Sequence, residues 1–151
     1  MTIAAIVAIA SVINAVLPAV GRASNALVSA SSVADDRISS RIEIIHATGQ
    51  DAATQADAWV KNTGASQIAA LDQMDLFFGP ETDFQRVAYG GAGCTAPCWD
   101  YELENDSSWN PTATLHIIVY LDVADALVAG TTYYVKVVAP NGIEDSKFFT
   151  L

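Results

Sequence analysis

The chain opens with MTIAAIVAIASVINAVLPAV, residues 1–20, in which apolar side chains surround the helix axis on every side. A helix with no polar face leaves no side for water, so it is typical of a segment covered by lipid or by other helices. About 20 such residues are enough to cross a bilayer. This stretch therefore predicts a hydrophobic helix at the start of the chain.

The helical pattern continues past Arg22, because Ala26, Leu27 and Ala30 recur at helical spacing. We predict a helical domain over residues 1–40 that serves as filament core or membrane anchor, with a kink at Pro18. At about 1.5 Å per residue it is roughly 60 Å long, which exceeds one bilayer. Its outer half must therefore pack against something other than lipid.

The predicted helix also carries small residues four apart, such as Ala4 with Ala8, which permit close helix-to-helix approach. Alanine is also common in membrane segments that do not associate. We predict that copies of the chain assemble through the apolar side chains of this helix: Ile3, Ala4, Ile6, Val7, Ala8, Ile9, Val12, Ile13, Val16, Leu17 and Val20.

A cleavable secretory signal is the alternative reading of this segment. Residues 28–30, Val-Ser-Ala, resemble a small-residue cleavage site, and cleavage there would release a secreted enzyme or lectin. A signal peptide normally has a basic residue before its apolar run, and no Lys or Arg precedes this one. We therefore expect the helix to be retained and a short leader to have been removed already.

From Arg41 onward the hydrophobic period changes to two, which is typical of strands. Glycine, proline and asparagine mark turns between short runs, as at Gly130 and Asn141-Gly142. We predict an immunoglobulin-like antiparallel β-sandwich over residues 41–151, and hence an α+β chain. The expected strands are Ile42–Ala47, Ala56–Asn62, Met74–Phe78, Phe84–Tyr89, Trp99–Glu104, Thr114–Leu121, Tyr133–Val138 and Ser146–Thr150.

The charged residues, like the apolar ones, are distributed unevenly between the two parts of the chain. All 17 acids lie from Asp35 onward, where six of the seven bases also lie, so this part has a net charge of 6 − 17 = −11. Such a surface repels polyanions, which excludes nucleic acid and anionic lipid as partners.

The sequence contains no motif of an enzyme active site, so we predict no catalytic residue, no cofactor and no metal site. Asp100, Glu102 and Glu104 share one face of a predicted strand, and Trp99 lies on the other. Carboxylates so arranged suit a calcium ion or a solvated outer face, and we favour the solvated face. Asp72 and Asp75 are interpreted in the same way.

Three tryptophans, Trp59, Trp99 and Trp109, and the five tyrosines would suit either a carbohydrate-binding platform or the core, and their strand positions favour the core. Cys94 and Cys98 are close enough for a local disulfide, whereas zinc would need further ligands. A disulfide implies an oxidising location outside the cytoplasm.

Asn105-Asp106-Ser107 is an N-glycosylation acceptor motif in a predicted loop. The motif occurs often by chance, so it raises the expectation of a glycan at Asn105 only modestly.

The order of these parts resembles the archaeal type IV pilin superfamily, specifically archaellins and archaellar stator proteins. The resemblance rests on the uncharged opening helix and on three later stretches: DRISSRIEII (36–45), AWVKNTG (58–64) with LDQMDLF (71–77), and GTTYYVKVVAPNG (130–142). The second and third stretches look closest to the stator branch. The glycine-rich opening of many archaellins is absent, and the cysteine pair is not a family feature.

The resemblance implies a structural protein that a prepilin peptidase processes and a membrane ATPase assembles from the bilayer into a helical homopolymer at the cell surface. We therefore predict a subunit of an archaellum-like filament for motility or adhesion. The alternative is a membrane-anchored stator protein whose sandwich binds an envelope protein.

Overall fold

The computed structural model describes residues 21–25, 28–29, 31–32, 35 and 38–151. The described residues from Gly21 to Ser39 are helical. The remainder of the predicted helix, including Pro18 and the assembly residues from Ile3 to Val20, lies outside the described residues. The chain divides into two compact units, Met1–Asp35 and Asp36–Leu151. The predicted domain boundary between residues 40 and 41 stays a prediction.

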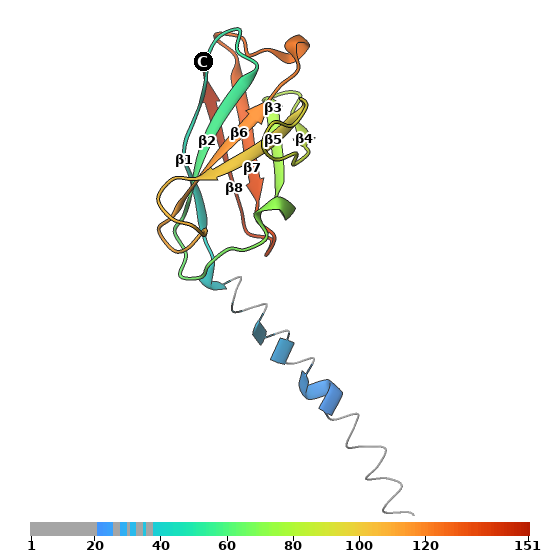
Figure 1. Cartoon of the computed structure of the whole chain (residues 1–151), viewed down its shortest axis with the longest axis vertical. Helices are drawn as coiled ribbons and strands as arrows, with labels where there is room; N and C mark the ends of the chain where they lie inside the picture. Colours follow the sequence, from blue (N-terminus) through green and yellow to red (C-terminus); the bar gives the residue numbers. More distant parts are fainter. Residues whose placement is uncertain (1–20, 26–27, 30, 33–34, 36–37) are drawn as a thin grey trace, which may run out of the picture. The chain divides into compact units, whose positions relative to one another are not determined.

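Residues 38–151 form a β-sandwich of two four-stranded sheets in which every strand pair is antiparallel (Figure 1). One sheet has the order β1 (Ile42–Gly49), β2 (Gln55–Asn62), β6 (Thr114–Tyr120), β5 (Cys98–Leu103). The other has the order β4 (Gln85–Val87), β3 (Asp75–Pro80), β7 (Thr132–Val138), β8 (Glu144–Thr150). Two 3-10 turns, η1 (Leu71–Gln73) and η2 (Val123–Asp125), complete the described elements. The predicted antiparallel sandwich is confirmed.

Strict alternation of apolar and polar residues explains why the two sheets pack. In β6 the side chains of Leu115, Ile117 and Val119 point inward and are at most 1% exposed. Tyr133, Val135 and Val137 of β7 do the same from the opposite sheet. Because a strand turns successive side chains to opposite faces, these two strands form the centre of the core. The buried core residues run from Ile42 to Ala139, and the half-buried Ile143, Phe149 and Leu151 pack against them.

The sheet edges formed by β1, β8 and β5 are covered by side chains and a loop. Asp145 of β8 accepts a hydrogen bond from the backbone N–H of Ile44 (2.7 Å), and Lys147 donates to the carbonyl of Ile45 (3.0 Å). The edge of β5 is covered by residues 88–90, because the backbone groups of Trp99 bond to Ala88 and Gly90. Covered edges prevent sheet extension by a second chain.

Candidate functional site

The best-defined polar site in the sandwich is a buried amide at the end of β2. The side chain of Asn62 is 0% exposed. Its Nδ2 donates to the carbonyls of Ser66 (2.9 Å) and Trp109 (3.0 Å), and its Oδ1 accepts from the N–H of Gly64 (3.0 Å). An amide has two donor hydrogens and one carbonyl oxygen, and all three are engaged. The side chain therefore fixes the loop that follows β2.

This loop in turn holds the segment that leads into β1. The N–H groups of Thr63 and Gly64 donate to the carbonyl of Arg41 at 2.8 and 3.0 Å, and Ala65 N–H donates to Ser39 O at 2.7 Å. The hydroxyl oxygens of Ser39 and Ser66 lie 2.6 Å apart. We call Asn62–Ser66 with Ser39–Arg41 the entry clamp. It fixes the backbone of the residues immediately before the sandwich.

Only glycine fits at one position of the entry clamp. A Cβ added to Gly64 would collide with the backbone N of Arg41 and would lie 2.7 Å from the carbonyl oxygen of Ser39. Backbone atoms cannot move aside as a flexible side chain can, so a larger residue would push the two segments apart. The stretch containing Asn62 and Gly64 carried part of the family resemblance, but the sequence did not indicate the clamp itself.

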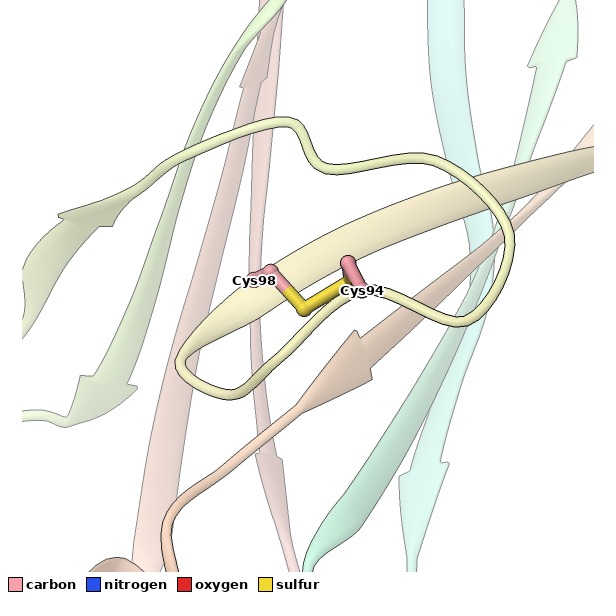
Figure 2. Close-up of a disulfide and its surroundings, with 2 residues drawn as sticks. All are labelled: Cys94 and Cys98. Carbon is pink, nitrogen blue, oxygen red and sulfur yellow. A yellow bond between two sulfur atoms is a disulfide. The ribbon is translucent and has the colours of Figure 1, made fainter.

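The two cysteines are joined in a disulfide (Figure 2). Cys98 begins β5 and is buried, and Cys94 lies in the loop before it. Gly90 packs directly against this bridge, since an added Cβ would collide with the Cβ of Cys94. The disulfide therefore pins a loop of residues 90–98 against the start of β5.

The predicted glycosylation motif lies in the exposed loop between β5 and β6. Asn105 Oδ1 accepts from the N–H of Thr114 at 3.0 Å. The carboxylate of Asp106 accepts from Asn110 Nδ2 (2.9 Å) and from the N–H of Ser107 (2.7 Å), and these two bonds lower the pKa of Asp106 from 3.8. The loop is thus held by its own polar side chains.

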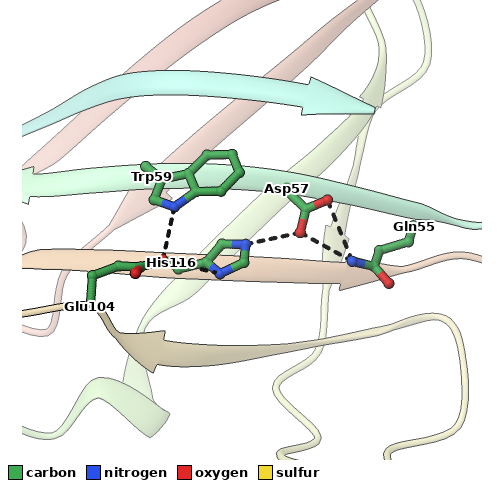
Figure 3. Close-up of polar contacts among 5 residues, drawn as sticks. All are labelled: Gln55, Asp57, Trp59, Glu104 and His116. Atoms are coloured by element: carbon green, nitrogen blue, oxygen red, sulfur yellow. Dashed lines mark hydrogen bonds and ion pairs between the residues drawn. The ribbon is translucent and has the colours of Figure 1, made fainter. Parts of the chain in front are cut away.

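The outer face of the β1-β2-β6-β5 sheet carries a polar and aromatic network (Figure 3). The rings of Trp59 and His116 stack with centroids 4.4 Å apart and planes at 5°. Trp59 Nε1 donates to Glu104 at 3.1 Å, and His116 Nε2 lies 2.9 Å from Asp57. Both carboxylates are therefore engaged by neighbouring rings. Within the part of the chain that the structure describes, no three His, Cys, Asp or Glu side chains gather into a group that could hold a metal ion.

The tryptophans have different environments. Trp99 and Trp109 are buried in the core, as predicted. Trp59 is half-buried on the outer face, so core packing was the wrong prediction for this residue. Trp59 faces outward because side chains alternate along a strand, and Asp57 and Lys61, two residues away on either side in β2, lie on the same outer face.

The predicted acidic residues lie at the surface. Glu102 is exposed and Asp100 half-buried, while Trp99 on the opposite face is fully buried, which agrees with the solvated-face interpretation. Asp75 forms an ion pair with Arg86 at 2.6 Å. Nearby, burial raises the pKa of Tyr89 above 10.0, and Tyr101 and Asp100 add to the rise. These acids belong to surface networks.

A further feature was missed by the sequence reading: exposed aromatic rings on the outer face of the β4-β3-β7-β8 sheet. Phe84 and Phe148 are 46% and 55% exposed. The available signal was strand alternation. Tyr134 alternates with buried residues and Phe148 with half-buried ones, and both share their face with Lys136 and Ser146.

A sequence model of the archaeal-type flagellin family matches residues 1–148. The chain belongs to the archaeal-type flagellin family. The resemblance found in the sequence is thereby confirmed. No helix in the described ranges combines the length and apolarity needed to span a bilayer.

Three proteins are similar to this member of the flagellin family, one by sequence and two by structure. An uncharacterized protein of Archaeoglobus fulgidus is 27% identical over 157 residues, covering 99% of this chain and 93% of that protein. The archaellum periplasmic stator protein complex FlaF and FlaG from Sulfolobus acidocaldarius contains a chain that is 29% identical, with a TM-score of 0.62; the match covers 72% of this chain and 87% of that one.

The archaeal flagellum of Methanospirillum hungatei strain JF1 shares the fold, with a TM-score of 0.64 and 15% identity over 99% of this chain and 89% of that one. Both structural neighbours are parts of the archaellum. The chain is accordingly related to the structural proteins of the archaellum.

Proposed function

We propose that the chain is a structural subunit of a helical archaellum-like filament, assembled through its N-terminal hydrophobic helix with the β-sandwich on the outside. The observation that carries this proposal is the extent of the family match. The flagellin model covers residues 1–148, so it includes both the apolar segment 1–20 and the sandwich.

The physical argument for assembly starts from the apolar segment. In a bilayer, lipid covers residues 1–20, and outside it neighbouring helices must do so, because burial of apolar surface is favourable by about 25 cal/mol per Å². Identical contacts that do not close into a ring generate an open helical polymer. The proposed partners are other copies of the chain and, before assembly, the membrane, a prepilin peptidase and an assembly ATPase.

The entry clamp gives the sandwich a role in this filament. A slack connection between two parts of a subunit would leave the outer part free to reorient, at a cost in ordering entropy on assembly. The backbone of Ser39–Arg41 is instead held by hydrogen bonds from Thr63, Gly64 and Ala65. We assign the clamp the task of fixing where the N-terminal segment leaves the sandwich.

Two observations support the immunoglobulin-like form of the sandwich. The strand orders β1-β2-β6-β5 and β4-β3-β7-β8 correspond to the two sheets of that fold, taken in chain order. The hydroxyl of Tyr133, at the start of β7, accepts a hydrogen bond at 2.9 Å from the N–H of Val128. A tyrosine that bonds back to the preceding corner is a hallmark of immunoglobulin-like domains.

Fractionation of cells tests the filament proposal. The chain should dominate the material sheared from the cell surface and should form fibres in electron micrographs. Recovery with the membranes, at low abundance and absent from sheared fibres, would contradict the proposal. That outcome would favour a membrane-anchored stator protein that binds an envelope protein, a reading supported by the 29% identity to the stator complex.

We also propose that the sandwich matures outside the cytoplasm, with the disulfide formed and Asn105 as a glycan acceptor. Asn105 is exposed, and its Oδ1 rather than its Nδ2 is engaged by Thr114. Mass spectrometry of protein from sheared fibres should show the Cys94–Cys98 bond intact and a modified Asn105 peptide. A free Asn105 in all copies would exclude the glycan.

A further inference from the structure

Three aromatic side chains, the exposed Phe84 and Phe148 and the half-buried Tyr134 between them, form a continuous row on the outer face of the β4-β3-β7-β8 sheet. Tyr134 and Phe148 are cross-strand partners in β7 and β8, with ring centroids 4.9 Å apart. Phe84 folds over Gly79 and packs on the other side of Tyr134, with centroids 4.6 Å apart. We call Phe84, Tyr134 and Phe148 the aromatic ridge. Exposed apolar surface that is contiguous, rather than scattered, marks an interaction site.

The strand residues that face outward around the aromatic ridge carry no net charge. Their charged side chains form two ion pairs, Arg86 with Asp75 at 2.6 Å and Lys136 with Glu144 at 2.8 Å, while Glu81 and Asp83 lie in the turn before Phe84. The hydrogen bond that Lys136 donates to Glu144 also raises the pKa of Lys136 above 10.5. Both basic side chains on this face are therefore paired with an acidic side chain.

The rest of the sandwich is strongly acidic. Residues 38–151 hold 15 acids (17 less Asp35 and Asp36) and five bases (seven less Arg22 and Arg37). Removing the two ion pairs of the neutral face leaves 13 acids against three bases elsewhere. Two copies of the sandwich would repel each other through most of their surface, and they would repel least where this face is the contact.

The geometry of the ridge argues against a sugar as the occupant. Sugar rings stack on flat aromatic platforms, whereas the planes of Tyr134 with Phe84 and with Phe148 meet at 51° and 43°. Tilted rings leave grooves between them that another set of side chains can fill. A basic partner is also disfavoured, because it would be drawn to the acidic faces instead.

We propose that the aromatic ridge is a contact surface between the sandwiches of two copies of this chain. The inference rests on the proposed function, because a filament brings copies of the chain together at the high local concentration that this contact needs. The contact is made face to face, since Asp145 and Lys147 fill the β8 edge and residues 88–90 cover β5. Aromatic side chains of the ridge supply the buried centre, and the two ion pairs form its polar rim.

Sedimentation of the isolated sandwich, residues 38–151, tests the proposal. Its core is contained within this range, so we expect the fragment to fold by itself, and circular dichroism checks this. It should associate reversibly at concentrations up to about 1 mM, and more strongly in high salt, because salt screens the repulsion between acidic copies. Phe148→Glu and, separately, Phe84→Glu should weaken association by about tenfold or more.

A matched control is Val123→Glu, which adds the same charge at an 85% exposed position in η2. Its association should change far less than that of Phe148→Glu, and circular dichroism should show all variants folded. The proposal would be overturned if the wild-type sandwich stayed monomeric at every concentration, or if all variants lost the same amount of association. Binding of a soluble cell-wall glycan to a monomer through Phe148 would also overturn it. Fibres of the full chain in electron micrographs report on the filament function separately, because helix assembly does not require the ridge.

Discussion

The buried side chain of Asn62 donates a hydrogen bond to the backbone carbonyl of Trp109, 47 residues further along the chain, at 3.0 Å. Trp109 itself is 1% exposed, and its carbonyl also accepts from Ile68 N–H. Two loops that are remote in sequence are therefore tied together at the end of β2, beside the residues that lead into β1. The relationship explains why a polar residue occupies an otherwise apolar interior.

Replacing Asn62 with alanine should destabilise residues 38–151 by about 3 kcal/mol, because several buried backbone groups would lose their partners at about 1–3 kcal/mol each. Urea unfolding followed by circular dichroism measures the change. Gln67 is exposed, so Gln67→Ala should change stability by less than about 0.5 kcal/mol. Equal effects of the two substitutions would contradict the role assigned to Asn62.

Gly64→Ala tests whether the entry clamp depends on close backbone approach. The added Cβ would collide with Arg41 N, so we expect a loss of about 2 kcal/mol or more and faster amide exchange at Thr63–Ala65. Gly130 is the comparison position. Its φ of +78° is strained for alanine, but an added Cβ would meet no other atom within 4 Å. Gly130→Ala should therefore cost only the backbone strain, about 1 kcal/mol. A smaller effect at Gly64 than at Gly130 would rule out the steric explanation.

The sequence predicted the sandwich well because its strands obey strict alternation. Every expected strand, including Thr114–Leu121 and Tyr133–Val138, overlaps an observed one. The same rule places Trp59 outside, since its neighbours of equal parity are Asp57 and Lys61, although its position within a strand had favoured the core. The aromatic ridge was missed for a related reason: the tyrosines, which include Tyr134, were assigned to the core.

Contacts between remote loops could not be predicted in the same way. Nothing local to Asn62 indicates that its amide reaches Trp109, because that pairing depends on how the loops meet after both sheets have formed. The disulfide, by contrast, joins residues only four apart. The predicted assembly residues between Ile3 and Val20 lie outside the described residues and stay a prediction.

Removal of the disulfide should have a local and moderate effect. Closing a loop this short restricts the unfolded chain little, so replacing Cys94 and Cys98 by serine should cost about 2 kcal/mol. Hydrogen exchange should increase in residues 90–98 and remain unchanged in β6 and β7. Loss of the whole fold on reduction would show that the bridge supports more than its own loop.

Acid sensitivity should depend on Asp106. Its pKa is lowered in the folded state by hydrogen bonds from Asn110 and Ser107. A lowered carboxyl pKa contributes stability that is present above the unfolded value near 3.8 and is lost as the pH falls through the folded value. Asn110→Ala removes the larger cause, so the pKa of Asp106 should rise toward 3.8, as followed by NMR titration. The variant should then lose less stability than wild type on acidification, and an unchanged Asp106 titration would refute this cause.

Assembly through the N-terminal helix is tested by placing one charge in it. Ala8→Asp introduces a carboxylate where we predict helices to be covered by one another, and an unpaired buried charge is too costly to tolerate. Electron microscopy of cell-surface material should show fibres for wild type and none for Ala8→Asp, while the sandwich of the variant stays folded by circular dichroism. Normal fibres built from Ala8→Asp protein would contradict assembly through this helix.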